Sequence, residues 1–536
     1  MDFIASIRKR GVGRTLTKKE FVRTDVLYYT HDMKRLFSIG TIVISFALFA
    51  VPGAASAATP FEVTGWIPYW RSATGTADVL PNLSKLTEVN PFVYTLKSDG
   101  TFVDNGVLDQ EPWLSFIAAA KAQKVRVIPT VMTSNSALLH DILSDSKKRI
   151  ALEVYTANLV KEKGFDGIDL DFEGKKAEDK DNYSTFLKGL YARMGNKWVM
   201  CTIESRTPLD SRYYGTDIPP DAEIYANDFK EINKYCDRVR IMAYDQQGID
   251  LKLAAQAASS SQLYAPVADP AWVEKAVNLA AKDIARSKIL IGVPTYGYEY
   301  DVTAYANNDY VYKILWTFNP GYAWPIAQSY GITPERNAAG EMYFTYVSTA
   351  ATSSPPVSLG PNSASLAAAA ASQYATAYNS HLNFRLMEWP DAQSVQTKID
   401  LARKLGIRGI SIFKFDGGED PAIWNTLAGV KGTTVSASVQ TGSSGTVSGT
   451  LSRGLDVGST GADVLLLQKF LNTSPDTQVA ASGVGSPGHE TTYFGPATAK
   501  AVGKFQIKYG LATASSPGFG YVGPKTRAKI NQLLST

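Results

Sequence analysis

The chain has 536 residues, of which 45% are apolar and 19% charged, so we expect a globular protein with two or more folded units. Its two cysteines and four scattered histidines exclude a disulfide framework and a Cys/His metal centre. The formal net charge of +4 belongs to residues 1–57, because these hold nine of the 54 basic and four of the 50 acidic residues and leave 45 and 46 for the remainder.

The first 57 residues have the pattern of an export signal. Basic residues at 34–35 precede a mostly apolar run over 39–51, and an Ala-Ser-Ala sequence ends at Ala57. The run is well short of the ~20 residues that a membrane-spanning helix needs, so we predict cleavage after Ala57, with an uncleaved anchor as the alternative. Met33, directly before the basic pair, is a second possible start. We therefore expect a secreted, periplasmic or cell-wall-associated protein with no membrane attachment after cleavage.

Between residues 58 and 430, short β-branched runs alternate with helix-length segments. This alternation predicts α/β structure, and eight such runs favour a closed parallel (β/α)8 TIM barrel over an open sheet. The predicted strands are Val63–Tyr69, Phe92–Leu96, Val125–Met132, Gly167–Phe172, Trp198–Ile203, Val239–Tyr244, Lys288–Pro294 and Gly409–Phe415.

A further segment, from Tyr298 to about Met387, is too long for one crossover. Residues 341–346 within it alternate like a strand. We therefore predict a small α+β insertion between strands seven and eight. Because barrel enzymes keep their active sites at the carboxyl ends of the strands, residues that end strands are the candidates for function.

Residues 165–174 contain an acidic strand. Side chains alternate faces along a strand, so Asp169, Asp171 and Glu173 point one way and the apolar residues between them point the other way. If the apolar face packs on the helices, three carboxylates enter the barrel, where burial and mutual repulsion disfavour their ionisation. An edge strand with a solvated acidic face is the alternative, but it leaves the motifs on the other strands unexplained.

Asp166, Asp169, Asp171 and Glu173 make the pattern DxxDxDxE, which resembles the signature of glycoside hydrolase family 18. Later segments resemble the same family in the same order, and the resemblance, which is towards the spore-cortex-lytic branch, covers residues 62 to about 428. These segments are Pro91–Tyr94 with Asp99-Gly100, Val239–Asp245, Gly292–Gly297, Phe384–Ala392 and Gly406–Phe413.

The resemblance implies a retaining glycosidase without cofactor or metal. Glu173 is expected to protonate the leaving oxygen, with a pKa raised by partial burial and a neighbouring acid. The nucleophile in this family is the substrate's own acetamido oxygen. Asp171 is expected to hold the acetamido N–H, and Asp169 to share a proton with it. Tyr244 is expected to hydrogen-bond the acetamido carbonyl.

The resemblance and the aromatic content give further candidates for substrate contact, namely Met242, Asp245, Tyr296, Trp389 and Phe413. Asp245 is expected to bind a sugar hydroxyl or to pair with a neighbour. Tyr296 and Trp389 are candidates for stacking on sugar faces, although aromatics at barrel ends are buried for packing about as often. At Phe413 the family usually has a tryptophan as the floor of the cleavage subsite, so the sequence departs from the pattern there.

Cys201 and Cys236 fall on or just before neighbouring strands. Since one lies within its strand and the other precedes its strand, we expect two unpaired, buried thiols. A disulfide between them is the alternative.

Residues 431–450 are rich in Ser, Thr and Gly, have no hydrophobic periodicity and are expected to form a linker. The module at 451–536 has eight basic and four acidic residues and an internal repeat, Tyr493–Thr498 and Tyr521–Thr526, in which Gly-Pro opens a helix. With helical spacing over 463–471, these features resemble the small three-helix peptidoglycan-binding domain. The resemblance implies cell-wall glycan as the partner of this module.

The leading hypothesis is a secreted enzyme that hydrolyses β-1,4-linked N-acetylglucosamine-containing glycan in peptidoglycan. The runner-up is hydrolysis of chitin or chito-oligosaccharides by the same chemistry. A third hypothesis is an inactive carbohydrate-binding barrel, but such proteins typically lose the terminal acid, which is present here as Glu173. The expected partner is a polysaccharide and not a nucleic acid, and we expect a monomer.

Overall fold

The structure is a computed structural model that describes residues 59–259, 262–348, 363–435 and 449–534, without residues 475, 481–484, 488, 489, 515 and 517. The predicted export signal and most of the predicted linker lie outside these residues. Within the described part of the chain, no helix has both the length and the apolar character needed to cross a membrane.

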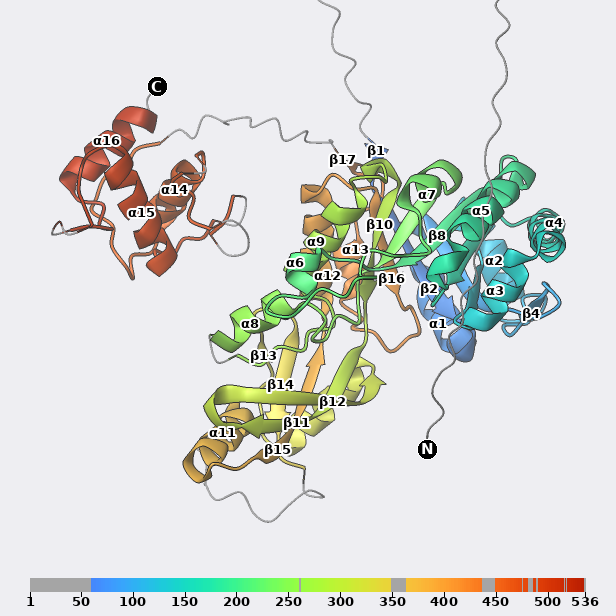
Figure 1. Cartoon of the computed structure of the whole chain (residues 1–536), viewed down its shortest axis with the longest axis horizontal. Helices are drawn as coiled ribbons and strands as arrows, with labels where there is room; N and C mark the ends of the chain where they lie inside the picture. Colours follow the sequence, from blue (N-terminus) through green and yellow to red (C-terminus); the bar gives the residue numbers. More distant parts are fainter. Residues whose placement is uncertain are drawn as a thin grey trace, which may run out of the picture. The chain divides into compact units, whose positions relative to one another are not determined.

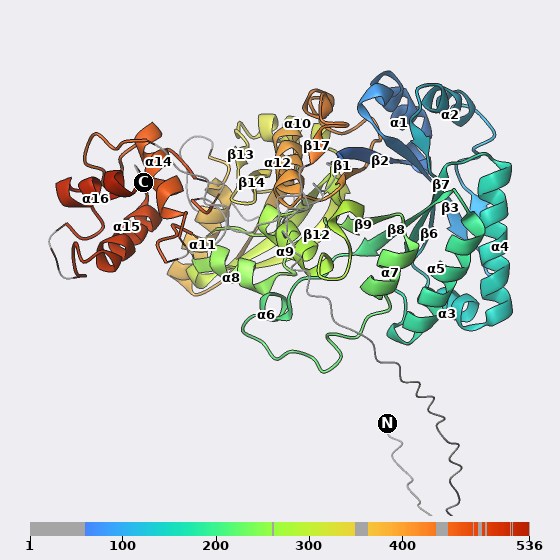
Figure 2. The same ribbon diagram turned by 90° about the horizontal axis from the view of Figure 1, so that it is seen from above.

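The eight predicted strands form a closed parallel barrel (Figures 1 and 2). Each barrel strand pairs with the next one along the chain, and β16 pairs with β2, which closes the barrel. The third barrel strand is interrupted. The barrel strands are β2 Glu62–Pro68, β3 Glu88–Leu96, β5 Arg126–Val127 followed by β6 Thr130–Thr133, β7 Gly167–Phe172, β8 Trp198–Glu204, β9 Arg238–Met242, β10 Ile289–Pro294 and β16 Gly409–Phe413.

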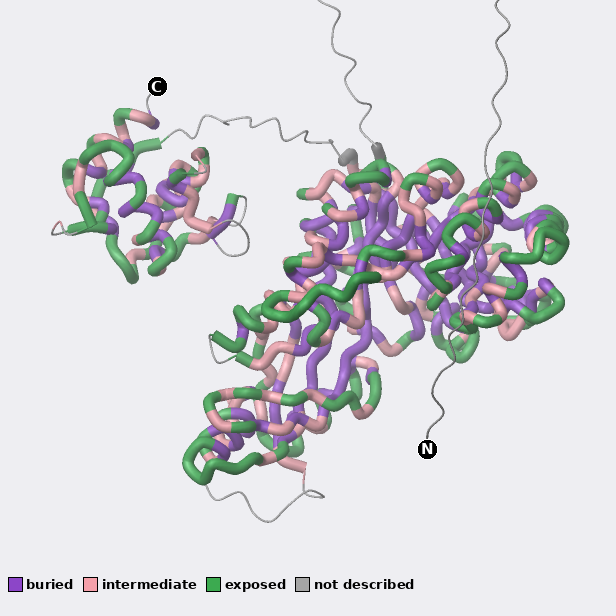
Figure 3. The backbone as a smooth tube through the Cα atoms, viewed as in Figure 1, coloured by how far each residue is buried: buried purple, intermediate pink, exposed green. Residues whose placement is uncertain are grey.

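Helices surround the strands, and the strands are largely buried (Figure 3). Apolar side chains on the outward faces of the strands pack against the helices. Phe172 of β7, for example, stacks on Phe186 of α5 with the ring centroids 6.0 Å apart. The helices of the barrel region are α1 Ser72–Val79, α2 Trp113–Ala122, α3 Ser136–Ser144, α4 Ser146–Glu162, α5 Lys180–Met194, α6 Leu209–Arg212, α7 Phe229–Tyr235, α8 Leu251–Ser259, α9 Pro270–Ala280, α12 Ala392–Lys404 and α13 Ile423–Leu427.

Two short antiparallel pairings complete the barrel region. Strand β4 (Phe102–Asp104) pairs with β3. Strand β1 (Thr59–Pro60) pairs with β17 (Thr434–Val435), so the first and last described segments of the barrel region are joined.

A five-stranded antiparallel sheet between β10 and β16 is the predicted α+β insertion (Figure 1). Its side chains alternate, so Phe384 and Leu386 of β15 join a core with α11, while Met387 and Trp389 join a core with α10. Helices therefore cover both faces of the sheet. The elements are β11 Gly297–Tyr305, β12 Asp309–Phe318, α10 Ala323–Ser329, β13 Glu335–Arg336, β14 Met342–Tyr346, α11 Leu366–Tyr378 and β15 Leu382–Trp389.

Cys201 and Cys236 form a disulfide, so the prediction of two unpaired thiols is wrong. Their Cα atoms lie 5.9 Å apart, within the usual range for a disulfide. Cys201 lies on the outward face of β8, opposite Val239 of β9, and Cys236 caps the end of α7 just before β9. The turn from α7 into β9 thus brings Cys236 to the outer face of β8. The positions of the two cysteines along the sequence do not reveal this, because it depends on the path of the turn.

The described residues of 449–534 fold around a hydrophobic core of their own, with the predicted helices α14 Ala462–Leu471, α15 Pro496–Lys508 and α16 Pro524–Leu534. The internal sequence repeat has a structural counterpart. Gln468 Nε2 donates to Thr498 Oγ1 at 2.9 Å, and Gln506 Nε2 donates to Thr526 Oγ1 at 3.0 Å. Each glutamine also donates to the carbonyl of the tyrosine that begins the repeat. A buried glutamine therefore joins each of the first two helices to the start of the next.

Candidate active site

Strand β7 carries the acidic row into the barrel. Its apolar side chains lie in the core between the barrel and its helices, so Asp169 and Asp171 face the barrel interior and Glu173 follows at the carboxyl end. The alternation predicted from the sequence is confirmed.

Asp169 is fully buried and contacts polar groups from four other barrel strands. Both of its carboxylate oxygens take part in these contacts, which hold Asp169 in place. The hydrogen-bond donors, each at 2.8 or 2.9 Å, are Trp66 Nε1 of β2, Thr130 Oγ1 of β6 and Thr202 Oγ1 of β8, and Arg240 Nη1 of β9 forms an ion pair at 2.9 Å.

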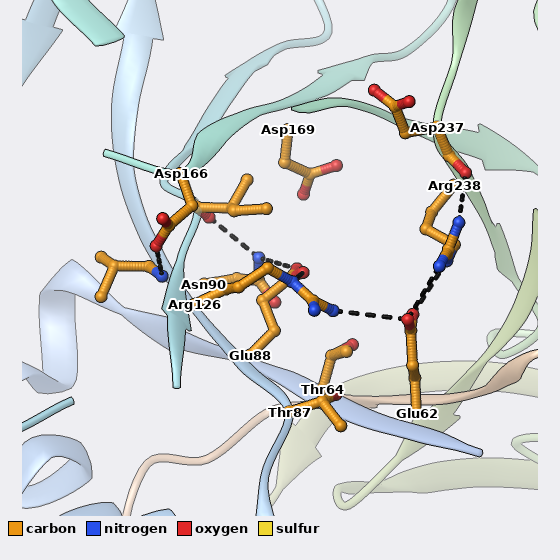
Figure 4. Close-up of polar contacts among 12 residues, drawn as sticks. Glu62, Thr64, Thr87, Glu88, Asn90, Arg126, Asp166, Asp169, Asp237 and Arg238 are labelled. Atoms are coloured by element: carbon orange, nitrogen blue, oxygen red, sulfur yellow. Dashed lines mark hydrogen bonds and ion pairs between the residues drawn. The ribbon is translucent and has the colours of Figure 1, made fainter. Parts of the chain in front are cut away.

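Charged residues at the amino ends of the strands form ion pairs inside the barrel (Figure 4). Arg238 donates to Glu62 at 2.9 and 2.8 Å. Arg126 lies 3.5 Å from Glu62 and 3.2 Å from Glu88. Buried charges are tolerated when they are paired in this way, so this network closes the amino end of the barrel beneath the acidic row.

Asp171 is 4% exposed, and its Oδ1 atom has no hydrogen-bond partner among the described residues. Burial, followed by the negative charges of Glu173 and Asp169, holds the pKa of Asp171 well above its usual range, and Lys175 opposes this in part. The surroundings therefore favour the protonated form of Asp171 and leave one of its oxygens available to a ligand.

Glu173 is partly exposed and lines a cleft at the carboxyl ends of the barrel strands. Burial is the main reason that the pKa of Glu173 is raised, and the charge of Glu204 adds to the effect. This is the direction predicted from the sequence, and it suits a carboxyl group that donates a proton. The residues that line the cleft are Glu173, Glu204, Ser205, Thr207, Arg212, Met242, Tyr244, Asp245, Ile249 and Trp272.

Tyr244 lies two residues after the end of β9 and stacks on Phe413, with ring centroids 5.4 Å apart and ring planes at 17°. Gly292 of β10 makes room for this ring, because a Cβ atom at Gly292 would lie 2.5 Å from Tyr244 Cε1. Phe413 also meets the edge of Trp66, with the centroids 5.7 Å apart. Phe413 is thus part of an aromatic cluster with Tyr244, which lines the cleft.

Asp245 has a backbone φ of +58°, a conformation that is uncommon for residues other than glycine. Its Oδ1 atom accepts hydrogen bonds from the hydroxyls of Tyr296 and Tyr298, the second at 2.5 Å. Backbone strain of this kind costs about 1–3 kcal/mol and clusters at functional sites. Asp245 therefore pairs with neighbours, one of the two roles that the sequence predicted, and Tyr296, 5% exposed, is one of those neighbours.

Trp389 lies in the insertion and not in the cleft. It is 0% exposed and packs against Phe318, Phe344 and Trp324. A ring without an exposed face does not stack on a sugar, which corrects the expectation for this residue. Met242, in contrast, lines the cleft.

Glu204, Arg212 and Trp272 line the same cleft and are not among the residues predicted from the sequence. Glu204 ends β8, and an acidic residue at the carboxyl end of a barrel strand is the signal that identifies it. Arg212 belongs to α6 and Trp272 to α9, and their approach to the cleft depends on loops with no regular pattern.

The arrangement suits acid-catalysed cleavage of a bond to oxygen. A partly exposed carboxyl group with a raised pKa lies on the same face as a second, buried acid and near a tyrosine hydroxyl. In the described segments, no group of three or more His, Cys, Asp or Glu side chains is placed to hold a metal ion.

Residues 62–418 match the family described as "Glycosyl hydrolases family 18". Residues 460–530 match the family described as "Putative peptidoglycan binding domain". The first match spans the barrel strands with the insertion, and the second covers α14, α15 and the first part of α16.

"Uncharacterized glycosylase YvbX" of Bacillus subtilis (strain 168) is 25% identical over 229 residues, which cover 41% of this chain and 61% of that protein. "Chitinase A1" of Niallia circulans is 25% identical over 343 residues, which cover 50% of this chain and 47% of that protein. The chain thus spans less than two thirds of either relative.

Among solved structures, the spore cortex-lytic enzyme SleL of Bacillus megaterium QM B1551 is similar, with 19% identity and a TM-score of 0.50. The similarity covers 69% of this chain and 74% of that chain. It shows a shared fold.

Proposed function

Because this chain belongs to glycosyl hydrolase family 18 and is therefore a glycoside hydrolase, we propose that it cleaves the β-1,4-linked N-acetylglucosamine-containing glycan of peptidoglycan. The proposed reaction proceeds with retention, and Glu173 is its general acid. The observation that carries the proposal is the acidic row of β7, which ends in Glu173 at a cleft on the carboxyl ends of the barrel strands.

In the proposed mechanism, Glu173 donates its proton to the leaving glycosidic oxygen. Burial and nearby negative charge raise the pKa of this carboxyl group, so it keeps its proton to higher pH than an ordinary glutamate does. General acid catalysis of this kind contributes about 10²–10⁴-fold to a rate.

The substrate supplies the nucleophile. Its 2-acetamido oxygen attacks the anomeric carbon while the bond to the leaving oxygen breaks, which gives a cyclic oxazolinium ion. Asp171 accepts a hydrogen bond from the acetamido N–H. The positive charge that develops on the oxazolinium ring favours the ionised form of Asp171, which offsets that charge. Tyr244 donates a hydrogen bond from its hydroxyl to the acetamido oxygen. Water then attacks the anomeric carbon, and the bond from that carbon to the acetamido oxygen breaks, which restores the acetamido group. Glu173 takes up the proton of that water, and the product keeps the original configuration.

Two features support a wall polymer as the substrate. The match of residues 460–530 provides a domain whose family is described as binding peptidoglycan. The disulfide between Cys201 and Cys236 suits an oxidising compartment outside the cytoplasm, where disulfides persist. Both features fit an enzyme that is exported and acts at the cell wall.

Chitin and chito-oligosaccharides are the second candidate substrates, supported by the likeness to chitinase A1 of Niallia circulans. Peptidoglycan and chitin both offer an N-acetylglucosamine residue whose acetamido group can attack. The same side chains would therefore act on either polymer.

Incubation of the purified protein with peptidoglycan and with chitin, followed by mass spectrometry of the released ends, tests the proposal. We expect reducing-end N-acetylglucosamine from peptidoglycan, released faster than products from chitin. Reducing-end N-acetylmuramic acid from peptidoglycan would contradict the proposed bond. Release from chitin alone would favour the second candidate.

A further inference from the structure

A further acid, Glu204, lies beside the acidic row. Glu204 ends β8, the strand next to β7, and lines the same cleft as Glu173. Its Oε1 atom accepts a hydrogen bond from the backbone N–H of Gly174 at 3.1 Å, and its Oε2 atom accepts one from Asn227 Nδ2 at 2.7 Å. Gly174 directly follows Glu173 and has a φ of +62°, a conformation that glycine adopts readily. Glu204 therefore holds the turn through which the chain leaves Glu173.

Lys175 holds the same turn from the other side. Its side chain is 1% exposed, and its ammonium group donates to the backbone carbonyl of Phe172, the residue before Glu173. The Nζ atom lies 3.8 Å from Glu204 Oε2 and 5.0 Å from the ring centre of Tyr183. Phe172, Lys175, Glu204 and Gly174 thus form a closed set of contacts around Glu173.

We propose that Glu204 and Lys175 form a clamp on the turn after Glu173, which positions the catalytic acid and sets the charge beside its carboxyl group. The proposal rests on the proposed role of Glu173 as general acid. Glu204 and Lys175 are positioning residues in this scheme, because they act through Glu173.

The two clamp residues change the pKa of Glu173 in opposite directions. Glu204 raises the pKa of Glu173, second only to burial, because a nearby negative charge disfavours ionisation. Lys175 lowers the pKa of Glu173, because a nearby positive charge favours ionisation. Further charged or titratable groups also face this cluster, namely Asp171 of β7, Tyr183 of α5, Arg206 after β8, Arg212 of α6, and Tyr244 and Asp245 after β9.

The consequence for catalysis has a definite sign. A general acid works only while it is protonated, so activity is lost as the pH rises through the pKa of Glu173. Glu204 extends activity to higher pH, and Lys175 limits that extension. A variant without one of these charges moves the alkaline limb of the pH profile in a direction that identifies the charge removed.

Glu204→Gln removes the charge and preserves the shape of the clamp. A glutamine oxygen still accepts from Gly174. Its amide group faces Asn227 Nδ2, so the Asn227 amide has to turn over for Oδ1, which is buried and has no partner among the described residues, to accept from it. Lys175→Met removes the cation and keeps an unbranched side chain. Glu274→Gln is the matched control, because Glu274 lies on the outer helix α9 and pairs with Lys404.

Two measurements on the full-length protein test the clamp. The first is the pH profile of kcat/KM on a soluble N-acetylglucosamine oligomer. The second is an NMR titration of Glu173 in protein with carboxyl-labelled glutamate, in which the Glu173 signal is assigned by its absence from Glu173→Gln. We expect Glu204→Gln to shift both the alkaline limb and the Glu173 titration to lower pH. Lys175→Met should shift both to higher pH, and Glu274→Gln should shift neither.

Unchanged titration of Glu173 in Glu204→Gln, or a shift to higher pH, would overturn the clamp. This test depends on Glu204→Gln alone, so it remains decisive even if Lys175→Met fails to fold. If the wild-type protein cleaves no N-acetylglucosamine polymer but the two titrations move in opposite directions, the proposed function fails and the clamp stands, so the two failures are distinguishable.

Discussion

Asp171 and Glu173 lie on one face of β7, yet their surroundings suit them to different roles. Asp171 is 4% exposed and has an oxygen without a partner, whereas Glu173 is partly exposed and lines the cleft. A group that exchanges protons with substrate and water has to reach the cleft. A group that balances a developing positive charge acts best where water is excluded. Depth in the barrel therefore supports Glu173 as the acid and Asp171 as the partner of the acetamido group.

If Glu173 is the general acid, a side chain that cannot donate an acidic proton at this position should greatly lower turnover. Glu173→Gln keeps the shape of the side chain and cannot donate an acidic proton, so kcat should fall by about 100-fold or more. Binding of a soluble oligomer and the thermal unfolding midpoint should stay near wild-type values. Activity close to that of the wild type would remove Glu173 from its assigned role.

The role of Asp171 predicts dependence on the acetamido group. A fully de-N-acetylated oligomer should resist cleavage even when it binds, because only direct attack by water remains open. Asp171→Asn should also lower turnover of the N-acetylated oligomer, by about 10²–10³-fold if it resembles the loss of other electrostatic stabilisers. NMR of the product anomers checks both statements. An inverted first product, or equal rates on matched acetylated and de-acetylated oligomers, would exclude the substrate-assisted route.

At the scale of elements, the connection from β8 through α7 to β9 is the part of the barrel that a covalent bond restrains. The disulfide joins Cys201 of β8 to Cys236 at the end of α7, with a sequence separation of 35 residues. The same connection carries Asn227, which contacts Glu204, and it leads into the strand before Tyr244 and Asp245. Restraint of this connection therefore supports the wall of the cleft.

Loss of the disulfide should destabilise the barrel. A closed loop of this length corresponds to about 3–4 kcal/mol of stabilisation through the unfolded chain. Cys236→Ser should therefore lower the urea midpoint of the barrel transition, and a reductant should lower the wild-type midpoint in the same way. The reductant should leave the midpoint of Cys236→Ser unchanged. Equal midpoints for wild type and variant would show that the bond contributes nothing to stability.

At the scale of the whole molecule, the chain has separate hydrophobic cores. The barrel core and the core of residues 449–534 share no residues, and separate family matches cover the two regions. Catalytic candidates all lie in the barrel region. We therefore expect the C-terminal domain to affect where the enzyme acts and to leave the reaction itself unchanged.

Deletion of residues 436–536 tests this division and keeps β17, which pairs with β1. Hydrolysis of small soluble oligomers should be retained. Action on insoluble wall should fall on the order of 100-fold, because a second binding domain raises the effective concentration of the catalytic domain at the polymer. Equal losses on both substrates would mean that the C-terminal domain is part of the catalytic unit.

The sequence by itself determined the barrel, the insertion, the three C-terminal helices and the direction of the acidic row. The three C-terminal helices followed from the resemblance to a known domain. The others follow from local patterns, because hydrophobic periodicity along one segment sets which face it buries. Asp169, Asp171 and Glu173 share a face of β7 for this reason alone. The cleft position of Met242 and the neighbour pairing of Asp245 were likewise accessible from motifs that end a strand.

Only the tertiary structure decided the pairing of Cys201 with Cys236, the burial of Trp389 and the contact of Glu204 with the turn after Glu173. Each of these joins or places residues on different elements. Such contacts depend on the path of the loops between elements and on the packing of whole faces against each other. That path is set by the summed packing of the molecule, which the periodicity of any one segment does not contain.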